Sequence, residues 1–85
     1  MNARQFRQVV ALAEAGSFRH AAVALKISQP ALSKAVSSLE KELGVRLFDR
    51  QPRGVSLTEF GQRVVVHGRA LIAAEDDLFH DLGLI

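Results

Sequence analysis

A row of polar side chains in the middle of the chain has the chemistry needed to bind a nucleic acid. Gln29, Ser33 and Ser37 follow one another at steps of four residues, and Lys34 stands next to this row. In a helix this spacing places the side chains on one face. A glutamine amide can pair with the N6 and N7 edge of adenine in the major groove, and a lysine ammonium can bind phosphate. The row therefore predicts a helix face that reads duplex DNA.

Three residues at the start of this row have separate candidate roles. Gln29 is the candidate for direct base readout, and a solvated helix-cap residue is the alternative interpretation. Pro30 can touch a thymine methyl group, although proline also suits the first turn of a helix for structural reasons alone. Ser28 can cap the helix and also contact phosphate. The start of this helix is thus the part expected to meet the base pairs.

The remaining candidates divide between bases and phosphates. We expect Ser33 to reach a base or a phosphate and Lys34 to bind a phosphate, while Ser37 continues the same face. Arg53 lies in a Pro/Gly turn, where its side chain can reach the DNA backbone or the minor groove. A solvated loop charge is the alternative for Arg53. Arg19 adds positive charge, but no pattern ties it to a groove of DNA.

Two short apolar patterns are expected to hold this face in place. Their residues are spaced by three or four positions, which predicts one buried face on each of two helices. Between the two expected helices lie only Lys26, Ile27 and Ser28, followed by Gln29 and Pro30. So tight a link permits a hairpin or a steep crossing, and the helix-turn-helix crossing leaves the start of the second helix exposed. The patterns are Phe18, Ala21, Ala22 and Leu25, then Leu32, Val36, Leu39 and Leu43.

Caps and turn residues predict the other elements. A first helix carries an apolar stripe of Phe6, Val9, Val10 and Ala13 and ends at Gly16. Two β-rich segments flank the sequence QPRG at 51–54, which predicts a hairpin. The expected helices cover residues 2–15, 18–26, 29–43 and 59–82, and the expected strands cover 45–50 and 55–57.

The last helix carries an apolar face longer than a small domain can cover. Two rows along it repeat every seven residues, and we expect the helix to pair with a second copy of the chain. The alternative is that it folds back on its own domain. The residues expected at the dimer surface are Val64, Val65, Leu71, Ile72, Leu78, Phe79 and Leu82.

Composition argues against several other classes of protein. The chain has 85 residues, no cysteine and no apolar run near the ~18 residues of a membrane span. The three histidines are widely separated, and no nucleophile motif or phosphate-binding loop is present, so we expect no metal, no cofactor and no enzymatic activity. Residues 1–53 contain nine Lys or Arg and four acidic residues, a net charge of +5. Residues 54–85 contain two Arg and five acidic residues, a net charge of −3. A basic front and an acidic tail suggest that one end meets a polyanion.

Taken together, these motifs resemble the N-terminal DNA-binding domain of the LysR-type transcriptional regulators. The resemblance covers almost the whole chain and is densest from Phe6 to Gly61. The family often has Arg where this chain has Lys34, and larger polar or basic residues at Ser37 and Ser38. The matching runs are ALAEAGSF at 11–18, Ala21-Ala22, SQPALS at 28–33, Leu39-Glu40, LGV at 43–45, LFDR at 47–50, Arg53-Gly54 and Leu57-Thr58.

The resemblance implies a mainly α fold. Residues 1–58 would form a winged helix-turn-helix of three helices and a two-stranded wing, and residues 59–85 a linker and dimerisation helix. The implied function is that of a bacterial regulator in the cytoplasm, at the nucleoid, with a recognition helix at about 29–43. As a dimer it would bind an interrupted palindrome in double-stranded DNA.

The resemblance also implies a second, effector-binding domain of periplasmic-binding-protein type. We therefore expect this chain to be a DNA-binding fragment or a truncated gene product, with any small-molecule effector bound by the absent domain. The competing interpretation is a winged helix used only as a protein-interaction or dimerisation module. The modest net charge of +2 and the serine-rich third helix support that alternative.

Overall fold

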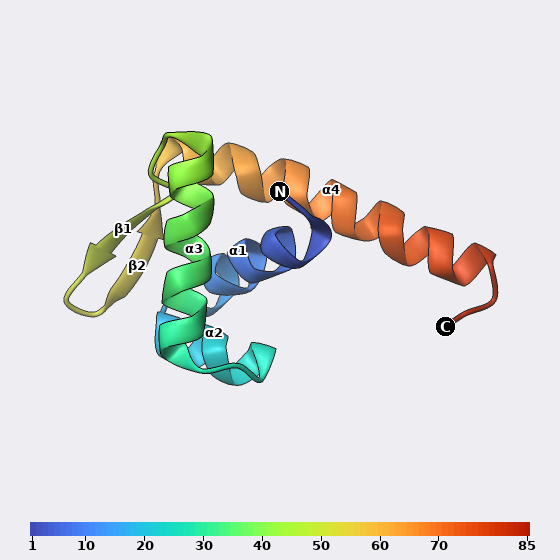
Figure 1. Ribbon diagram of the computed structural model, residues 1–85, viewed down its shortest axis with the longest axis horizontal. Coiled ribbons are helices and arrows are strands. Elements are labelled where there is room, and N and C mark those ends of the chain that lie inside the picture. The colour runs from blue at the N-terminus through green and yellow to red at the C-terminus, as the bar shows by residue number, and fades with distance from the viewer.

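The chain folds into four helices and one two-stranded antiparallel sheet (Figure 1), and the computed structural model describes residues 1–85. This confirms the predicted mainly α winged helix-turn-helix with a long last helix. In chain order the elements are α1 (Ala3–Ala15), α2 (Phe18–Leu25), α3 (Gln29–Leu43), β1 (Phe48–Gln51), β2 (Gly54–Leu57) and α4 (Glu59–Asp81).

Every helix boundary lies within one residue of its expected position, and a side-chain cap marks each helix start. Each cap accepts a hydrogen bond from the backbone N–H three residues ahead, which satisfies a donor that a helix start leaves open. Because such a cap is a local interaction, its residue type alone predicts where a helix begins. The capping residues are Asn2, Ser17, Ser28 and Thr58.

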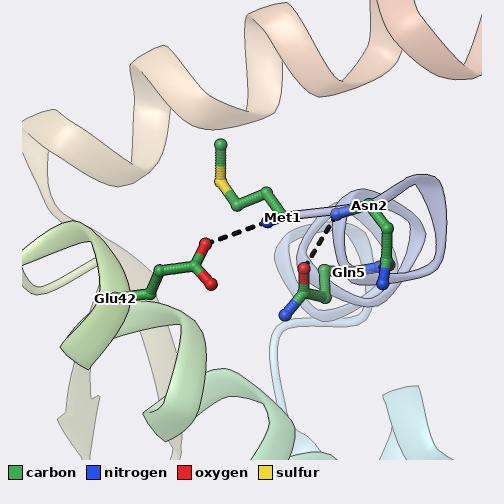
Figure 2. A network of polar contacts seen from close by, with 4 residues as sticks. All are labelled: Met1, Asn2, Gln5 and Glu42. Atoms are coloured by element: carbon green, nitrogen blue, oxygen red, sulfur yellow. Dashed lines mark hydrogen bonds and ion pairs between the residues drawn. The ribbon is translucent and has the colours of Figure 1, made fainter.

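A capping contact within α1 and an ion pair to α3 hold the N-terminal end of the chain (Figure 2). The Asn2 cap is reciprocal, because Oε1 of Gln5 accepts a hydrogen bond from the Asn2 backbone N–H at 2.8 Å. The Met1 ammonium group lies 3.0 Å from a carboxylate oxygen of Glu42 on α3. The start of α1 therefore lies beside the C-terminal end of α3.

The first strand begins at Phe48, three residues later than expected. Oε2 of Glu40 on α3 accepts hydrogen bonds from the backbone N–H groups of Leu47, at 2.7 Å, and Phe48, at 3.3 Å. The Leu47 carbonyl accepts from the backbone N–H of Thr58 at 3.0 Å. Backbone groups bound in this way are not free to extend a β ladder. Residues 45–47 are therefore a connection fixed to α3 and to the start of α4.

The hydrophobic core lies between α1, α2 and α3, with the base of the wing and α4 completing it. Leu12 and Leu47 lie outside the predicted apolar patterns, yet both are fully buried. Leu12 follows Val9 by three residues and so shares its helix face. The buried residues are Val9, Val10, Leu12, Phe18, Ala21, Ala22, Leu32, Val36, Leu39, Leu47, Phe48 and Val65.

Helix α4 has two halves with different surroundings. In the N-terminal half Val65 is only 4% exposed, and Gly68 lies against Phe6 of α1. The prediction that Val65 lies at a dimer surface is therefore corrected, because its side chain belongs to the domain's own core. In the C-terminal half the helix runs past α1 and away from the body (Figure 1).

Two ion pairs made by Arg7 tie the C-terminal half of α4 to α1. Nη2 of Arg7 donates to Glu75 at 2.7 Å and to Asp76 at 2.9 Å. These hydrogen bonds, first that to Glu75 and then that to Asp76, favour the charged guanidinium and raise the pKa of Arg7. Because the three side chains remain partly in solvent, the pairs orient α4 more than they stabilise the fold.

We expect Gly61→Ala to destabilise the protein, because a Cβ atom at this buried position would collide with the carbonyl oxygen of Leu47. Overpacking of this kind costs about 1–3 kcal/mol of unfolding free energy, and the better helix propensity of alanine returns only about 1 kcal/mol. Urea unfolding followed by circular dichroism measures the difference. Gly68→Ala is the matched control, because its Cβ would meet the movable Phe6 side chain, at 3.1 Å. Equal losses in the two variants would contradict this explanation.

Candidate nucleic-acid interface

Three residues connect α2 to α3, and their geometry sets the direction of α3. Lys26 is left-handed, with φ of +59°. Its N–H donates to the Val23 carbonyl, and the N–H of Ile27 donates to the Ala22 carbonyl, each at 3.1 Å. These are the two hydrogen bonds of a Schellman motif, which ends α2 abruptly. Ser28 caps the next helix at once, so α3 starts at the surface and crosses α2 steeply (Figure 1).

The start of α3 presents the predicted polar residues to solvent. Ser28, Gln29, Pro30 and Lys34 are exposed, and Ser33 between them is half-buried. Pro30 lies in the first turn, where its missing N–H leaves no helix hydrogen bond unmade. The opposite face of α3 is buried in the core. Burial of that face therefore fixes the rotation of α3 and turns the polar row outward.

The wing is docked on the turn between α1 and α2. The backbone N–H of Val55 donates to the Gly16 carbonyl at 2.9 Å. Gly54 has φ of +145°, and a Cβ there would collide with the same carbonyl oxygen, so only glycine fits this contact. Arg53 is exposed in the turn between β1 and β2, where it makes no intramolecular hydrogen bond or ion pair. The wing thus carries a free guanidinium at its tip.

A groove of about 440 Å³ lies between this wing and the starts of α2 and α3. It brings Gln29 and Arg53, which are far apart in sequence, to the walls of one concave surface. Arg19 lies in the same groove, although its position in the sequence gave no sign of this. His20 and Arg50 add to the basic character of the walls, and no acidic side chain lines it. The groove is therefore suited to an anionic ligand.

Ser37 lies in a different hollow from the other candidates. The hollow has about the same volume, 440 Å³, and is lined by Lys41, Arg46 and Glu40 as well as Ser37. Arg50 lines both this hollow and the groove, and it separates them. The structure thus brings Gln29 and Arg53 together but places Ser37 on the far side of Arg50.

Arg50 is the residue of this surface that the sequence analysis does not single out. Its Nη2 donates to Oγ of Ser33 at 3.1 Å, and its guanidinium carbon lies 4.4 Å from the centre of the Phe18 ring. A signal for it exists, because Phe48 and Arg50 are two residues apart on one strand and so share a face. Since Phe48 is buried, Arg50 must also point toward the helices.

The rest of the molecule offers no competing site for a metal, and none of its helices has the length and apolar character that a membrane crossing needs. No group of three or more His, Cys, Asp or Glu side chains is close enough to hold a metal ion. No buried side-chain nitrogen or oxygen lacks a hydrogen-bond partner. The polar chemistry of the chain is therefore concentrated on its surface.

Comparison with known proteins gives consistent matches. Residues 3–62 match the family described as "Bacterial regulatory helix-turn-helix protein, lysR family". The SDS degradation transcriptional activation protein of a Pseudomonas species is 55% identical over 69 residues, which are 81% of this chain and 22% of that protein. The regulator TfdT of Cupriavidus pinatubonensis is 44% identical over 73 residues, 86% of this chain and 32% of that protein. The chain thus spans a fifth to a third of the length of these relatives.

Two solved structures match over almost their full length. The complex of the BenM DBD with benA site 1 DNA superposes with a TM-score of 0.92 and 35% identity, covering 98% of this chain and 96% of that one. The complex of the CbnR DBD with DNA superposes with a TM-score of 0.90 and 33% identity, covering 95% and 93%. In both of these structures the matching protein is bound to DNA.

We expect Glu40→Ala to destabilise the fold and loosen the wing, because it removes the carboxylate that binds two backbone N–H groups. Hydrogen bonds to a charged group contribute about 1.5–3 kcal/mol, and the loss leaves two donors unpaired. Glu42→Ala is the control on the same helix, since Glu42 is exposed and pairs with the Met1 ammonium. It should change unfolding free energy by no more than about 0.5 kcal/mol. Thermal unfolding compares the two, and similar losses would show that Glu40 does not anchor the wing.

Proposed function

This chain belongs to the LysR family of bacterial regulatory helix-turn-helix proteins, a family of transcriptional regulators and not of enzymes, and we propose that it binds a specific DNA sequence. In this proposal α3 enters the major groove with its N-terminal end. The observation that carries the proposal is the shared groove of Gln29 and Arg53, which lies between an exposed helix start and a basic wing. A helix start and a wing so placed can follow adjacent grooves of one duplex.

Base reading is assigned to the tip of α3. Gln29 lies at the first helical position and is exposed, so its amide is free to pair with an adenine edge. Pro30 beside it offers an apolar contact to a thymine methyl group. The hydroxyl of Ser28 already accepts a hydrogen bond from the backbone N–H of Ala31 at 3.2 Å, and its proton remains available for a phosphate.

Phosphate binding is assigned to the basic residues around this tip. Lys34 lies one turn along the exposed face of α3, where its ammonium can reach the DNA backbone. Arg53 at the wing tip makes no intramolecular polar contact, so binding DNA would break none. Ser37, in the hollow beside Lys41 and Arg46, would contact the backbone further along the duplex.

The distribution of charge supports an orientation of the molecule on DNA. Five positive side chains lie on α3, on the wing or between the two, whereas four acidic side chains lie in the second half of α4. The positive ones are Lys34, Lys41, Arg46, Arg50 and Arg53, and the acidic ones are Glu75, Asp76, Asp77 and Asp81. A duplex would attract the first region and repel the second. The start of α3 would therefore approach DNA first. As a DNA-binding protein of a bacterial family, the chain would work in the cytoplasm at the nucleoid.

We expect Gln29→Ala and Lys34→Ala to weaken DNA binding in different ways. Loss of the amide should relax the preference at one base pair, at a cost of about 1–3 kcal/mol on the preferred site. Loss of the ammonium should weaken binding to all sequences and reduce the salt slope by about one unit. Selection from a random DNA pool yields the preferred site, and fluorescence anisotropy at several salt concentrations measures both variants. Equal losses for Gln29→Ala on every sequence would refute base reading by this residue.

The wild-type chain itself provides the test of DNA binding. Retention on random-sequence DNA at low salt, falling as salt rises, is expected from the phosphate contacts. A winged helix used only to bind proteins would show no retention, or retention without salt dependence. Either result would refute the proposed function.

We further propose that two copies pair through α4. Leu71, Leu78 and Leu82 recur at steps of seven and four residues and so share one helix face. With Phe79 they are between 38% and 59% exposed, in the C-terminal half of α4 and at its end. Paired helices would place two α3 tips in separate segments of the major groove, so the operator would be an interrupted palindrome.

The surface proposed for pairing is smaller than the sequence pattern alone predicts. Val64 and Ile72 are half-buried and pack against the domain's own core, which already contains Val65. These three residues serve the fold of one chain, and the outer leucines remain for a second copy. The sequence predicted a DNA-binding unit at residues 1–58 and a dimerisation helix at 59–85. This division stays a prediction about function, because the first half of α4 packs into the core of the first unit.

We expect Leu78→Glu to weaken pairing at least about tenfold, because it places a charge in an apolar contact that two copies share. The fold should be unaffected, since Leu78 is 53% exposed. Sedimentation velocity over a range of protein concentrations measures the association. Val23→Glu, at an exposed apolar position on α2, is the control and should leave association unchanged. Even weak association, with a Kd of about 100 μM, should be seen at a protein concentration of about 100 μM. A wild-type chain that remains monomeric there would refute pairing through α4.

A further inference from the structure

The Arg50 side chain joins the wing to both helices of the helix-turn-helix. It lies on β1, its guanidinium stacks over Phe18 of α2 at 4.4 Å from the ring centre, and its Nη2 donates to Ser33 of α3 at 3.1 Å. A planar guanidinium can stack and donate hydrogen bonds at the same time, which a lysine ammonium cannot do in this geometry. The contact therefore requires arginine for its shape as well as its charge.

This contact lies at the outer, ligand-facing end of the wing. Glu40 fixes the base of the wing by binding Leu47 and Phe48, and the Gly16 carbonyl binds Val55 on the other strand. Arg50 lies beyond the anchor at Glu40 and is paired with Val55 across the sheet, one residue pair before the hairpin turn. It separates the groove that contains Gln29 and Arg53 from the hollow that contains Ser37. Its contacts therefore link the outer part of the wing to α3 and α2.

The same contact defines how the Ser33 hydroxyl can be used. A serine hydroxyl has one proton to donate and two acceptor lone pairs. Since Arg50 donates to this oxygen, and a guanidinium nearby repels further cationic donors, the hydroxyl proton is directed to an acceptor. Ser33 lies on the face of α3 that carries Gln29 and Lys34, so that acceptor would belong to the DNA.

We propose that Arg50 is a positioning residue for sequence recognition. It aims the Ser33 hydroxyl as a hydrogen-bond donor and keeps the wing-tip Arg53 at a constant distance from Gln29. The inference rests on the proposed function, because it concerns how accurately that function selects its site. It differs from a simple phosphate contact, which any positive charge at position 50 would supply.

A double-mutant cycle on the 85-residue chain tests this role. The variants are Arg50→Lys, Arg50→Ala, Ser33→Ala and the double variant of the last two. Each is measured by anisotropy on the DNA site selected by the wild type and on a scrambled duplex of the same length. Thermal melting followed by circular dichroism checks that each variant folds. If Arg50→Ala does not fold, the comparison of Arg50→Lys with wild type still tests the role of Arg50.

If Arg50 is a positioning residue, Arg50→Lys should lose preference for the selected DNA site although it keeps the positive charge. Arg50→Lys should bind the scrambled duplex within about twofold of wild type with an unchanged salt slope, while its preference for the selected site falls roughly tenfold. On the selected site the double variant should bind at least about threefold better than the product of the single effects predicts. Arg53→Ala combined with Ser33→Ala is the control cycle. Its fold-change in Kd should equal the product of the two single fold-changes, because Arg53 makes no contact with Ser33.

The outcomes separate this inference from the proposed function. A wild-type chain that prefers no sequence would overturn both. A selective wild type with wild-type discrimination in Arg50→Lys would overturn only the positioning role, since charge alone would then suffice. A multiplicative cycle for Arg50 and Ser33 would do the same, because it would show that the two residues act independently.

Discussion

The placement of α3 depends on the three-residue turn that follows α2. Lys26 accepts a left-handed backbone, which costs a non-glycine residue of order 1 kcal/mol. Ile27 packs against the core and anchors the turn, and Ser28 starts the next helix without delay. Across this short connection the two helices cross steeply (Figure 1). The buried face that includes Leu32 and Val36 then decides the rotation of α3, and the exposed polar row follows from both constraints.

The wing takes its orientation from the helices, because two strands of four residues are not stable alone. Its contacts run from base to tip. Glu40 binds the backbone at the base, the Gly16 carbonyl binds the second strand, and Arg50 joins the first strand to α3 and α2. A basic hairpin that was not fixed to the helices would add positive charge but would not hold Arg53 in a defined place. Anchored in this way, it forms one wall of a groove whose other wall is the start of α3.

Helix α4 combines a structural role with a face that the domain does not cover. Gly61 lies against the Leu47 carbonyl and Gly68 against Phe6, so the first half of α4 approaches the body closely and completes the core. Past the end of α1 there is nothing for the helix to pack on (Figure 1). Arg7 holds the helix direction through Glu75 and Asp76. The angle between the outer half of α4 and α3 is therefore set within one chain.

The amino-acid sequence by itself determined the helix boundaries, the turn and the polar row at Gln29, because caps and helical spacing act over three or four residues. Only the tertiary structure decided which apolar residues of α4 serve the chain's own core. A seven-residue repeat cannot show that Val65 is buried in the core while Leu78 is 53% exposed. Likewise, the contact of Arg50 with Ser33 joins residues 17 positions apart. Such contacts arise only when independently formed elements pack, so their partners are set by the shape of the core.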